Sequence, residues 1–188
     1  MNAAPSVSTP DNDHPLARAF ILHWGEMGTH WGVNRSIAQI HALLYLSEHP
    51  ITAEEIAERL KLARSNVSTG LKELQSYEIV RRVHVEGDRR DHFTAETDLW
   101  EMLMRIVAER KRREIDATIS ALAGLNESLR HDPEAPAHVR ERIGAMHGFL
   151  VELSDWYTEV RSLPRSTLVK LIHLGGRIAR FLPGKREG

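Results

Sequence analysis

Apolar side chains recur every three or four residues through most of the first 75 positions, a spacing that predicts amphipathic helices. One helix is expected within residues 14–32, with an end weakened by its glycines, and a second over residues 36–46. Thr52 followed three residues later by Glu55 is typical of a capping box, in which each side chain satisfies a backbone donor of the other residue. A third, short helix is therefore expected to begin there.

The next segment predicts a fourth helix with two contrasting faces. Val67, Leu71 and Leu74 recur at helical spacing and form a narrow apolar stripe. The opposite face carries short polar and basic side chains: Arg64, Ser65, Asn66, Ser68, Thr69, Lys72 and Gln75. An ordinary solvated helix is the alternative interpretation, but serine and asparagine favour caps over helix interiors. A face that hydrogen-bonds to base edges and phosphates explains the pattern better.

The apolar period then changes from 3.6 to 2, which indicates β-strands. Residues 79–86 alternate in polarity, residues 87–90 form a turn signal, and residues 92–95 form a second run. The expected structure is a β-hairpin with Arg89 and Arg90 at its tip. Basic side chains there suit the DNA backbone or minor groove, although a charged tip can also serve to suppress edge pairing.

The second half of the chain returns to helical periodicity. A long helix is expected over residues 97–125, interrupted by the charged stretch 109–114, with a break over residues 126–136 and a last helix over residues 165–182. Between them lies a heptad seam with alternating steps of four and three: Val139, Ile143, Met146, Leu150, Leu153, Tyr157 and Val160. The seam is either intramolecular core or a dimer interface, and its length favours the interface.

Composition narrows the class of protein. The 188 residues carry a net charge of -1, yet residues 59–90 contain eight basic and four acidic side chains, which indicates a local anionic partner. The absence of cysteine excludes a disulfide framework and agrees with a cytoplasmic protein. The opening residues resemble no secretory signal, and the longest uncharged stretch, residues 36–47, is too short to span a membrane.

Other candidate chemistry is weaker. His23, Glu26 and His30 would share one face of an unbroken helix, as metal ligands could, but Gly25 and Gly28 lie within that span. No catalytic motif is present, so no catalytic residue, metal or cofactor is assigned. An aromatic cage could bind a quaternary ammonium effector, and the candidate residues for it are Trp24, Trp31 and Trp156. The alternative, which is the default for aromatic residues at helical spacing, is packing in the core or in a dimer interface.

Three short helices, a fourth with a polar face and a basic hairpin follow one another in the order of a winged helix-turn-helix. The run PITAEEIAERLKLARSNVSTGLKELQSYEIVRRVHVEGDRRDHF resembles the DNA-binding part of MarR-type regulators, and GDRRDHF followed by a long helix resembles their GbsR-like branch. The resemblance implies a homodimer on a near-palindromic operator. It also implies control of genes for osmoprotectant uptake or synthesis, with choline or glycine betaine as candidate effectors.

The expected fold is therefore mainly α with a small β-hairpin wing. Its expected parts are a disordered tail (1–13), an N-terminal dimerisation helix (14–32), the winged domain (33–96), helical dimerisation elements (97–182) and a C-terminal tail (183–188). The expected function is sequence-specific binding of double-stranded DNA, with repression as the simplest outcome. A helical adaptor or a metal-dependent hydrolase would leave the polar helix face unexplained. The DNA-contacting residues are expected to be Arg64, Ser65, Asn66, Ser68, Thr69, Lys72, Arg89 and Arg90.

Overall fold

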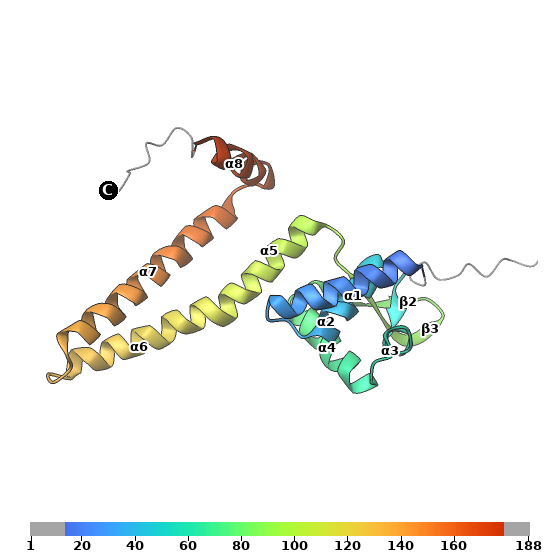
Figure 1. Cartoon of the computed structure of the whole chain (residues 1–188), viewed down its shortest axis with the longest axis horizontal. Coiled ribbons are helices and arrows are strands. Elements are labelled where there is room, and N and C mark those ends of the chain that lie inside the picture. The colour runs from blue at the N-terminus through green and yellow to red at the C-terminus, as the bar shows by residue number, and fades with distance from the viewer. Residues whose placement is uncertain (1–13, 179–188) are drawn as a thin grey trace, which may run out of the picture. The chain divides into compact units, whose positions relative to one another are not determined.

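The structure is a computed structural model that describes residues 14–178, and only the backbone of residues 175–178 (Figure 1). The chain divides into two units, one up to Glu109 and the other from Arg110. The two predicted tails, residues 1–13 and 183–188, lie outside the described residues. In the part of the chain that is described, no helix is long and apolar enough to cross a membrane.

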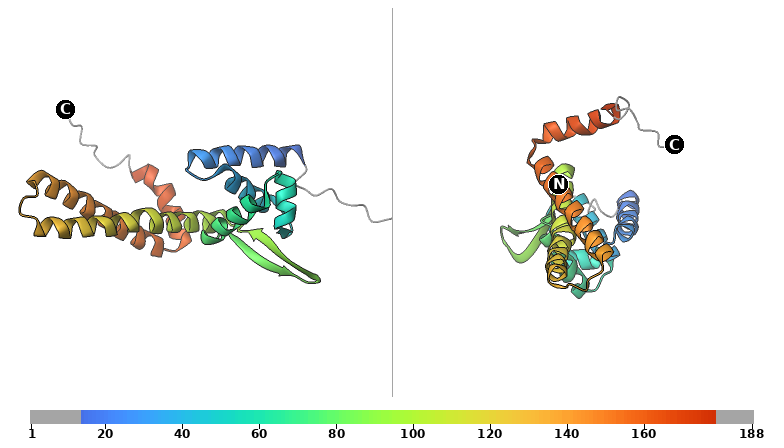
Figure 2. Two further views of the ribbon diagram at one scale, coloured as in Figure 1. Left: turned by 90° about the horizontal axis from the view of Figure 1, so that it is seen from below. Right: turned by 90° about the vertical axis from the view of Figure 1, so that its left-hand side faces the viewer.

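The first unit contains the predicted winged helix. Its elements follow in the order α1 (Pro15–His30), α2 (Arg35–Leu46), β1 (Ile51–Thr52), α3 (Ala53–Leu60), α4 (Arg64–Ser76), β2 (Val80–Val85), β3 (Asp88–Ala95) and α5 (Leu99–Arg110). The β2–β3 hairpin extends away from the helices of this unit and forms the wing (Figure 2). The predicted fold class, mainly α with a small β wing, is confirmed.

The sheet differs from the predicted hairpin in two respects. It has three antiparallel strands in the order β1–β3–β2, because Ile51 and Thr52 pair with Phe93 and His92. The turn is also shorter than expected, since β3 already begins at Asp88 and Gly87 adopts a φ of +82°. Arg89 and Arg90 therefore lie within β3, and the prediction that they form the hairpin tip is wrong.

The core of this unit lies between the helices and the base of the sheet. Ile40, Leu43, Ile56 and Val67 are almost completely buried there. The helix α1 continues through its glycines to His30, and Gly25 and Gly28 face α2. A Cβ atom at Gly28 would lie 2.6 Å from the Cβ of Ala38. The glycines thus allow two helices to approach closely, which offsets their low helix propensity.

The second unit contains the π-helix η2 (Lys111–Asp116), α6 (Ala117–His131), α7 (Ala137–Ser162) and α8 (Arg165–Ile178). The expected interruption over residues 109–114 is thus a π-helical segment, in which the helix continues with one extra residue per turn. The break predicted to begin at residue 126 begins only after His131. The helix α7 folds back along α6 and packs against it (Figure 1).

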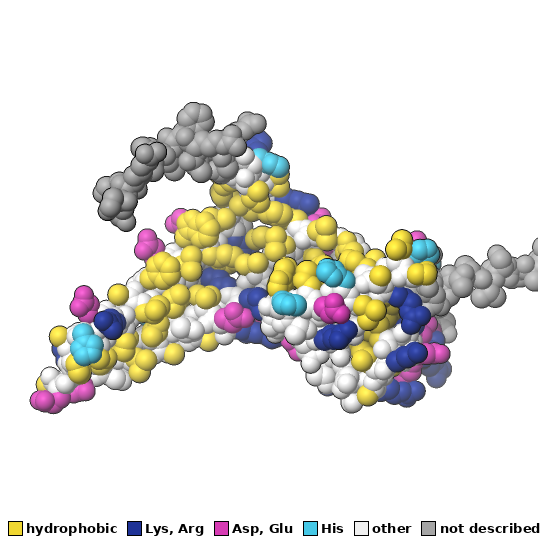
Figure 3. Space-filling model, in the orientation of Figure 1, with side chains coloured by type: hydrophobic (Ala, Val, Ile, Leu, Met, Phe, Trp, Pro, Cys, Tyr) yellow, Lys and Arg dark blue, Asp and Glu magenta, His cyan; other side chains and the backbone are white. Residues whose placement is uncertain are grey.

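The members of the heptad seam on α7 differ in burial. Five of its members are half-buried in the structure: Val139, Ile143, Leu150, Tyr157 and Val160. Met146 and Leu153 are exposed and belong to a second apolar stripe that also contains Phe149, Trp156 and Leu163. Hydrophobic side chains gather over α6 and α7 on the face seen in Figure 3. The wide apolar surface of α7 is therefore only partly covered by its own unit.

Candidate nucleic-acid interface

The helix α4 is seated by one face and exposed on the other. Val67, Gly70, Leu71 and Leu74 are buried against the rest of the unit. The six α4 side chains predicted to contact DNA are all exposed: Arg64, Ser65, Asn66, Ser68, Thr69 and Lys72. No ion pair within the described residues engages Arg64 or Lys72. This face can therefore offer hydrogen-bond donors and positive charge to a partner without first breaking an internal contact.

The four wing arginines fall into two classes. Arg82 forms an ion pair with Asp91, with Nη1 and Oδ2 3.1 Å apart, and Arg90 forms an ion pair with Asp88. Arg81 and Arg89 are exposed, and neither takes part in an ion pair among the described side chains. Arg81 and Arg82 are adjacent in β2, so their side chains point to opposite faces of the sheet.

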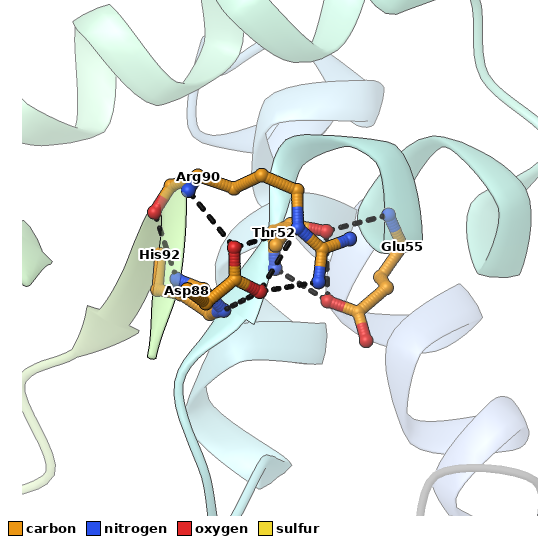
Figure 4. A network of polar contacts seen from close by, with 5 residues as sticks. All are labelled: Thr52, Glu55, Asp88, Arg90 and His92. Atoms are coloured by element: carbon orange, nitrogen blue, oxygen red, sulfur yellow. Dashed lines mark hydrogen bonds and ion pairs between the residues drawn. The ribbon is translucent and has the colours of Figure 1, made fainter. Parts of the chain in front are cut away.

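Arg90 is held in a network between β3 and the start of α3 (Figure 4). Its Nε donates to both carboxylate oxygens of Asp88 at 3.0 Å, and its backbone N–H donates to Oδ1 at 2.9 Å. These hydrogen bonds hold the pKa of the Asp88 carboxyl well below its usual range. His92 lies beside the pair, with Nε2 3.6 Å from Asp88 Oδ2. No hydrogen bond occupies Nη1 of Arg90 in the described structure, so that edge of the guanidinium is available.

The capping box of α3 forms the other half of the network. Thr52 N donates to Glu55 Oε2 at 2.6 Å, and Glu55 N donates to Thr52 Oγ1 at 3.2 Å. Partial burial alone would raise the pKa of the Glu55 carboxyl, but the hydrogen bonds from Thr52 and the charges of Arg59 and Arg90 outweigh it, and the pKa is lowered. The Glu55 carboxylate attracts the Arg90 guanidinium, although the two form no ion pair within the described residues.

A groove of about 430 Å³ separates α4 from the wing. The side chains of α4 that line it are Ser68, Leu71, Lys72 and Gln75, and the wing contributes Arg82, Arg90, Asp91 and Phe93. Ala53 and Glu54 complete it. Three of these side chains are basic and two are acidic, so the groove combines a site for anions with built-in counter-charges.

Comparison with known proteins assigns this arrangement to a family. Residues 31–91, which span α2, the helix-turn-helix and the beginning of β3, match the sequence model of the MarR family. This part of the chain is a MarR-type winged-helix domain. The matched residues include all of α4 and the wing as far as Asp91.

Similar proteins have been described in Bacillus subtilis (strain 168). The transcriptional repressor GbsR is 26% identical over 92 residues, which cover 49% of this chain and 51% of GbsR, so the chain spans about half the length of that relative. The transcriptional repressor OpcR is 19% identical over 84% of this chain and 83% of its own length. A crystal structure of a transcriptional regulator shares the fold, with a TM-score of 0.56 and 21% identity over 77% of this chain and 95% of that chain.

Of the three tryptophans proposed for an aromatic cage, Trp24 lines a cavity within the first unit. The cavity has a volume of about 220 Å³, and its other walls are Phe20, His41, Ala42, Tyr45, Leu99 and Met102. Trp31 is 60% exposed and does not line this cavity, and Trp156 belongs to the other unit. The signal that identifies the cavity is instead the helical spacing of Phe20 and Trp24 on α1 with His41 and Tyr45 on α2.

His41 is the unusual member of this cavity wall. Its side chain is buried, and Nε2 has no hydrogen-bond partner in the described structure. Burial lowers the pKa of His41 to about 4, so the imidazole is neutral at physiological pH. Buried polar atoms in native proteins are normally hydrogen-bonded, so an unpaired one on a cavity wall marks a position where a bound molecule can complete the contact.

The candidate metal ligands on α1 are engaged elsewhere. Glu26 forms an ion pair with Arg35 across 3.6 Å, and Nδ1 of His30 lies 2.9 Å from the carbonyl oxygen of Glu26. Among the described side chains, no three of the histidine, aspartate and glutamate residues are grouped as a metal ion would require. The sequence analysis did not identify Asp88 and Asp91 as partners of the wing arginines; their position on either side of the two arginines in DRRD was the available signal.

Proposed function

We propose that this protein is a homodimeric transcriptional regulator that binds a near-palindromic DNA operator, and that it acts as a repressor by competing with RNA polymerase for that DNA. The observation that carries the proposal is the exposed polar face of α4 beside a groove lined by wing arginines. The names of GbsR and OpcR, both repressors, support the same function. Genes for osmoprotectant uptake or synthesis are the proposed targets.

The contacts divide by chemistry. Arg64 can pair with the O6 and N7 acceptors of guanine, and Asn66 with the N6 and N7 groups of adenine, so these two side chains are proposed to read bases. Ser65, Ser68, Thr69 and Lys72 are suited to phosphates or to adaptable base contacts. Arg89 and Arg90 are proposed to contact the DNA backbone from the wing. With about 6 to 10 phosphate contacts per dimer, affinity falls by roughly 10³ to 10⁵ between about 50 and 200 mM salt.

Dimerisation is proposed to bury the exposed apolar stripe of α7. Met146, Phe149 and Trp156 are each more than half exposed, and large apolar side chains at steps of three and four along one helix normally face another helix. The half-buried members of the heptad seam would support this stripe from below. A symmetric pair of winged domains would then meet two half-sites of the operator.

An effector is proposed to act through the cavity at Trp24 and His41. The resemblance points to choline or glycine betaine, and the tryptophan supplies a direct optical probe. Titration with either compound should change the tryptophan fluorescence of the wild-type protein more than that of a Trp24→Phe variant, and it should change operator affinity. Identical responses of the two proteins would exclude this cavity as the site.

The experiment that tests the regulator function is the selection of bound sequences from a random duplex pool at about 150 mM salt, near physiological ionic strength. Enrichment of an inverted repeat, with half-site centres about 10 base pairs apart, is the expected result. Binding without enrichment would reduce the function to nonspecific DNA binding. Absence of binding would favour the alternative of a helical adaptor, which would use the same apolar stripe of α7 for another protein.

A further inference from the structure

The two ion pairs of the wing differ in how firmly they hold their arginine. Asp88 receives several hydrogen bonds from Arg90, including one from its backbone N–H. Asp91 receives a single hydrogen bond from Arg82, of 3.1 Å, and both side chains of that pair are half exposed. Exposed single ion pairs contribute little to stability and exchange readily with other charges. Of the two paired wing arginines, Arg82 is thus the one more easily transferred to another anion.

The Arg82–Asp91 pair lies in the groove between α4 and the wing. Arg82 pairs across the sheet with Phe93, and Asp91 lies two residues from Phe93 on the same face of β3. Both Arg82 and Asp91 line the groove, across from Lys72 on α4. Under the proposed function, a DNA backbone that reaches the recognition helix and the wing passes this groove. A phosphate there would meet Arg82 already bound to a carboxylate.

Asp91 and a phosphate would compete for one guanidinium. Arginine binds phosphate with two parallel hydrogen bonds, which a single-contact carboxylate pair cannot match. The Asp91 carboxylate also adds a negative charge within one screening length, about 10 Å at 0.1 M salt, of any phosphate in the groove. The loss of the Arg82–Asp91 contact and the repulsion between the Asp91 carboxylate and phosphate both oppose DNA binding, and neither depends on the base sequence.

We propose that Asp91 lowers the affinity of this protein for DNA. Its carboxylate competes with the phosphate backbone for Arg82, which contacts DNA once it is released. The inference rests on the proposed DNA-binding function. In this proposal Arg82 contacts a DNA phosphate, and Asp91 weakens that contact. Operator and random DNA are affected by the same factor, because the exchange involves only phosphate.

Four proteins test the proposal: the wild type, Asp91→Asn, Arg82→Ala and the double variant. Asparagine keeps the size of the side chain and removes its charge. We expect Asp91→Asn to bind a random 30-base-pair duplex about fivefold to tenfold more tightly at about 100 mM salt, with a salt slope steeper by about one ion. Arg82→Ala alone should change affinity by less than about twofold, since Asp91 already occupies that side chain. The double variant should lose the gain of Asp91→Asn.

The control for net charge is Asp155→Asn, an exposed position of α7 in the other unit. An unchanged or weakened Asp91→Asn variant, a gain that persists in the double variant, or an equal gain in Asp155→Asn would each overturn the role of Asp91. If the wild-type protein binds random DNA but selects no operator, the proposed regulator function is wrong. The affinities of the four proteins for random DNA would still decide the role of Asp91. Failure of all four proteins to bind DNA would overturn both.

Discussion

Gly70 of the recognition helix lies directly against Ile40 of α2, so that a Cβ atom at position 70 would stand 2.7 Å from Ile40 Cδ1. Ile40 is completely buried. The close approach seats α4, and with it the exposed polar face, on the helix that also carries His41. A glycine inside a helix is otherwise unfavourable by about 1 kcal/mol relative to alanine.

Gly70→Ala should therefore destabilise the protein, although alanine is the better helix former. Overpacking of a buried site costs about 1 to 3 kcal/mol, which exceeds the gain in helix propensity. Chemical denaturation measures the change, and DNA affinity should fall with it. The matched control is Gly124→Ala in α6, where no neighbouring atom lies within 4 Å of the added Cβ, and where we expect stabilisation. A Gly70→Ala variant as stable as the wild type would contradict the close seating of α4.

Base reading and phosphate binding should separate by mutation on α4. Asn66→Ala should cost about 1 to 3 kcal/mol on the selected operator and relax the preference at one base position, while Lys72→Ala should weaken operator and random DNA alike. Affinities for operator, a single-base variant and random DNA measure the difference. Arg130→Ala, an exposed position in α6, controls for the loss of positive charge. Equal losses on operator and random DNA for Asn66→Ala would refute its role in reading bases.

Stability should fall on mild acidification because of His41. Its pKa in the fold is about 4, below the ordinary value of 6.5, so the unfolded chain takes up a proton first as the pH falls. Above pH 6.5 the imidazole is neutral in both the folded and the unfolded chain. Between pH 6.5 and 4 it is protonated mainly in the unfolded chain, and the free energy of unfolding falls as the pH is lowered through this range. The free energy of unfolding should therefore be lower by about 2 kcal/mol at pH 5 than at pH 7.

Comparison with His41→Phe isolates this contribution, because the other titrating groups, including Glu55, remain in both proteins. The drop between pH 7 and pH 5 should be smaller in the variant by about the same 2 kcal/mol. Urea denaturation at the two pH values gives the numbers. If the wild type and the variant lose equal stability, then His41 does not titrate as its burial requires.

Leu153→Glu should shift the protein toward monomer. Leu153 is 40% exposed and lies in the apolar stripe proposed to meet a second copy, where a buried unpaired carboxylate is strongly unfavourable. Sedimentation velocity measures the change. Thr158→Glu places the same charge at an exposed polar position of α7 and should leave the assembly intact. A sedimentation coefficient unchanged by Leu153→Glu would remove the stripe from the interface.

The buried side of α4 and the capping box of α3 could be predicted from the sequence because both are local. The apolar positions Val67, Leu71 and Leu74 identify the buried side of α4, and Thr52 with Glu55 marks the start of α3; the structure confirms both. The local sequence pattern did not predict elements that form only through contacts with distant segments of the chain. The two residues of β1 have no period of their own and become a strand only because β3 lies beside them.

In the wing and in the long helix, too, the sequence predicted where a feature lies but not its detailed form. Gly87 marks the turn, but only the cross-strand register puts Arg82 and Asp91 on one face, so the ion pairs could not be assigned from DRRD alone. The interruption at residues 109–114 was visible as a gap in the apolar stripe, yet its π-helical form depends on backbone hydrogen bonds that leave no pattern in the side chains.

Thr52 belongs to two elements at once, since it is the last residue of β1 and the cap of α3. The hydrogen bonds that hold the edge of the sheet and those that start the helix-turn-helix therefore share one fully buried residue. Neither element can open while the other stays closed. In amide hydrogen exchange, the base of the wing and the first turn of α3 should consequently lose their protection together, as one cooperative unit.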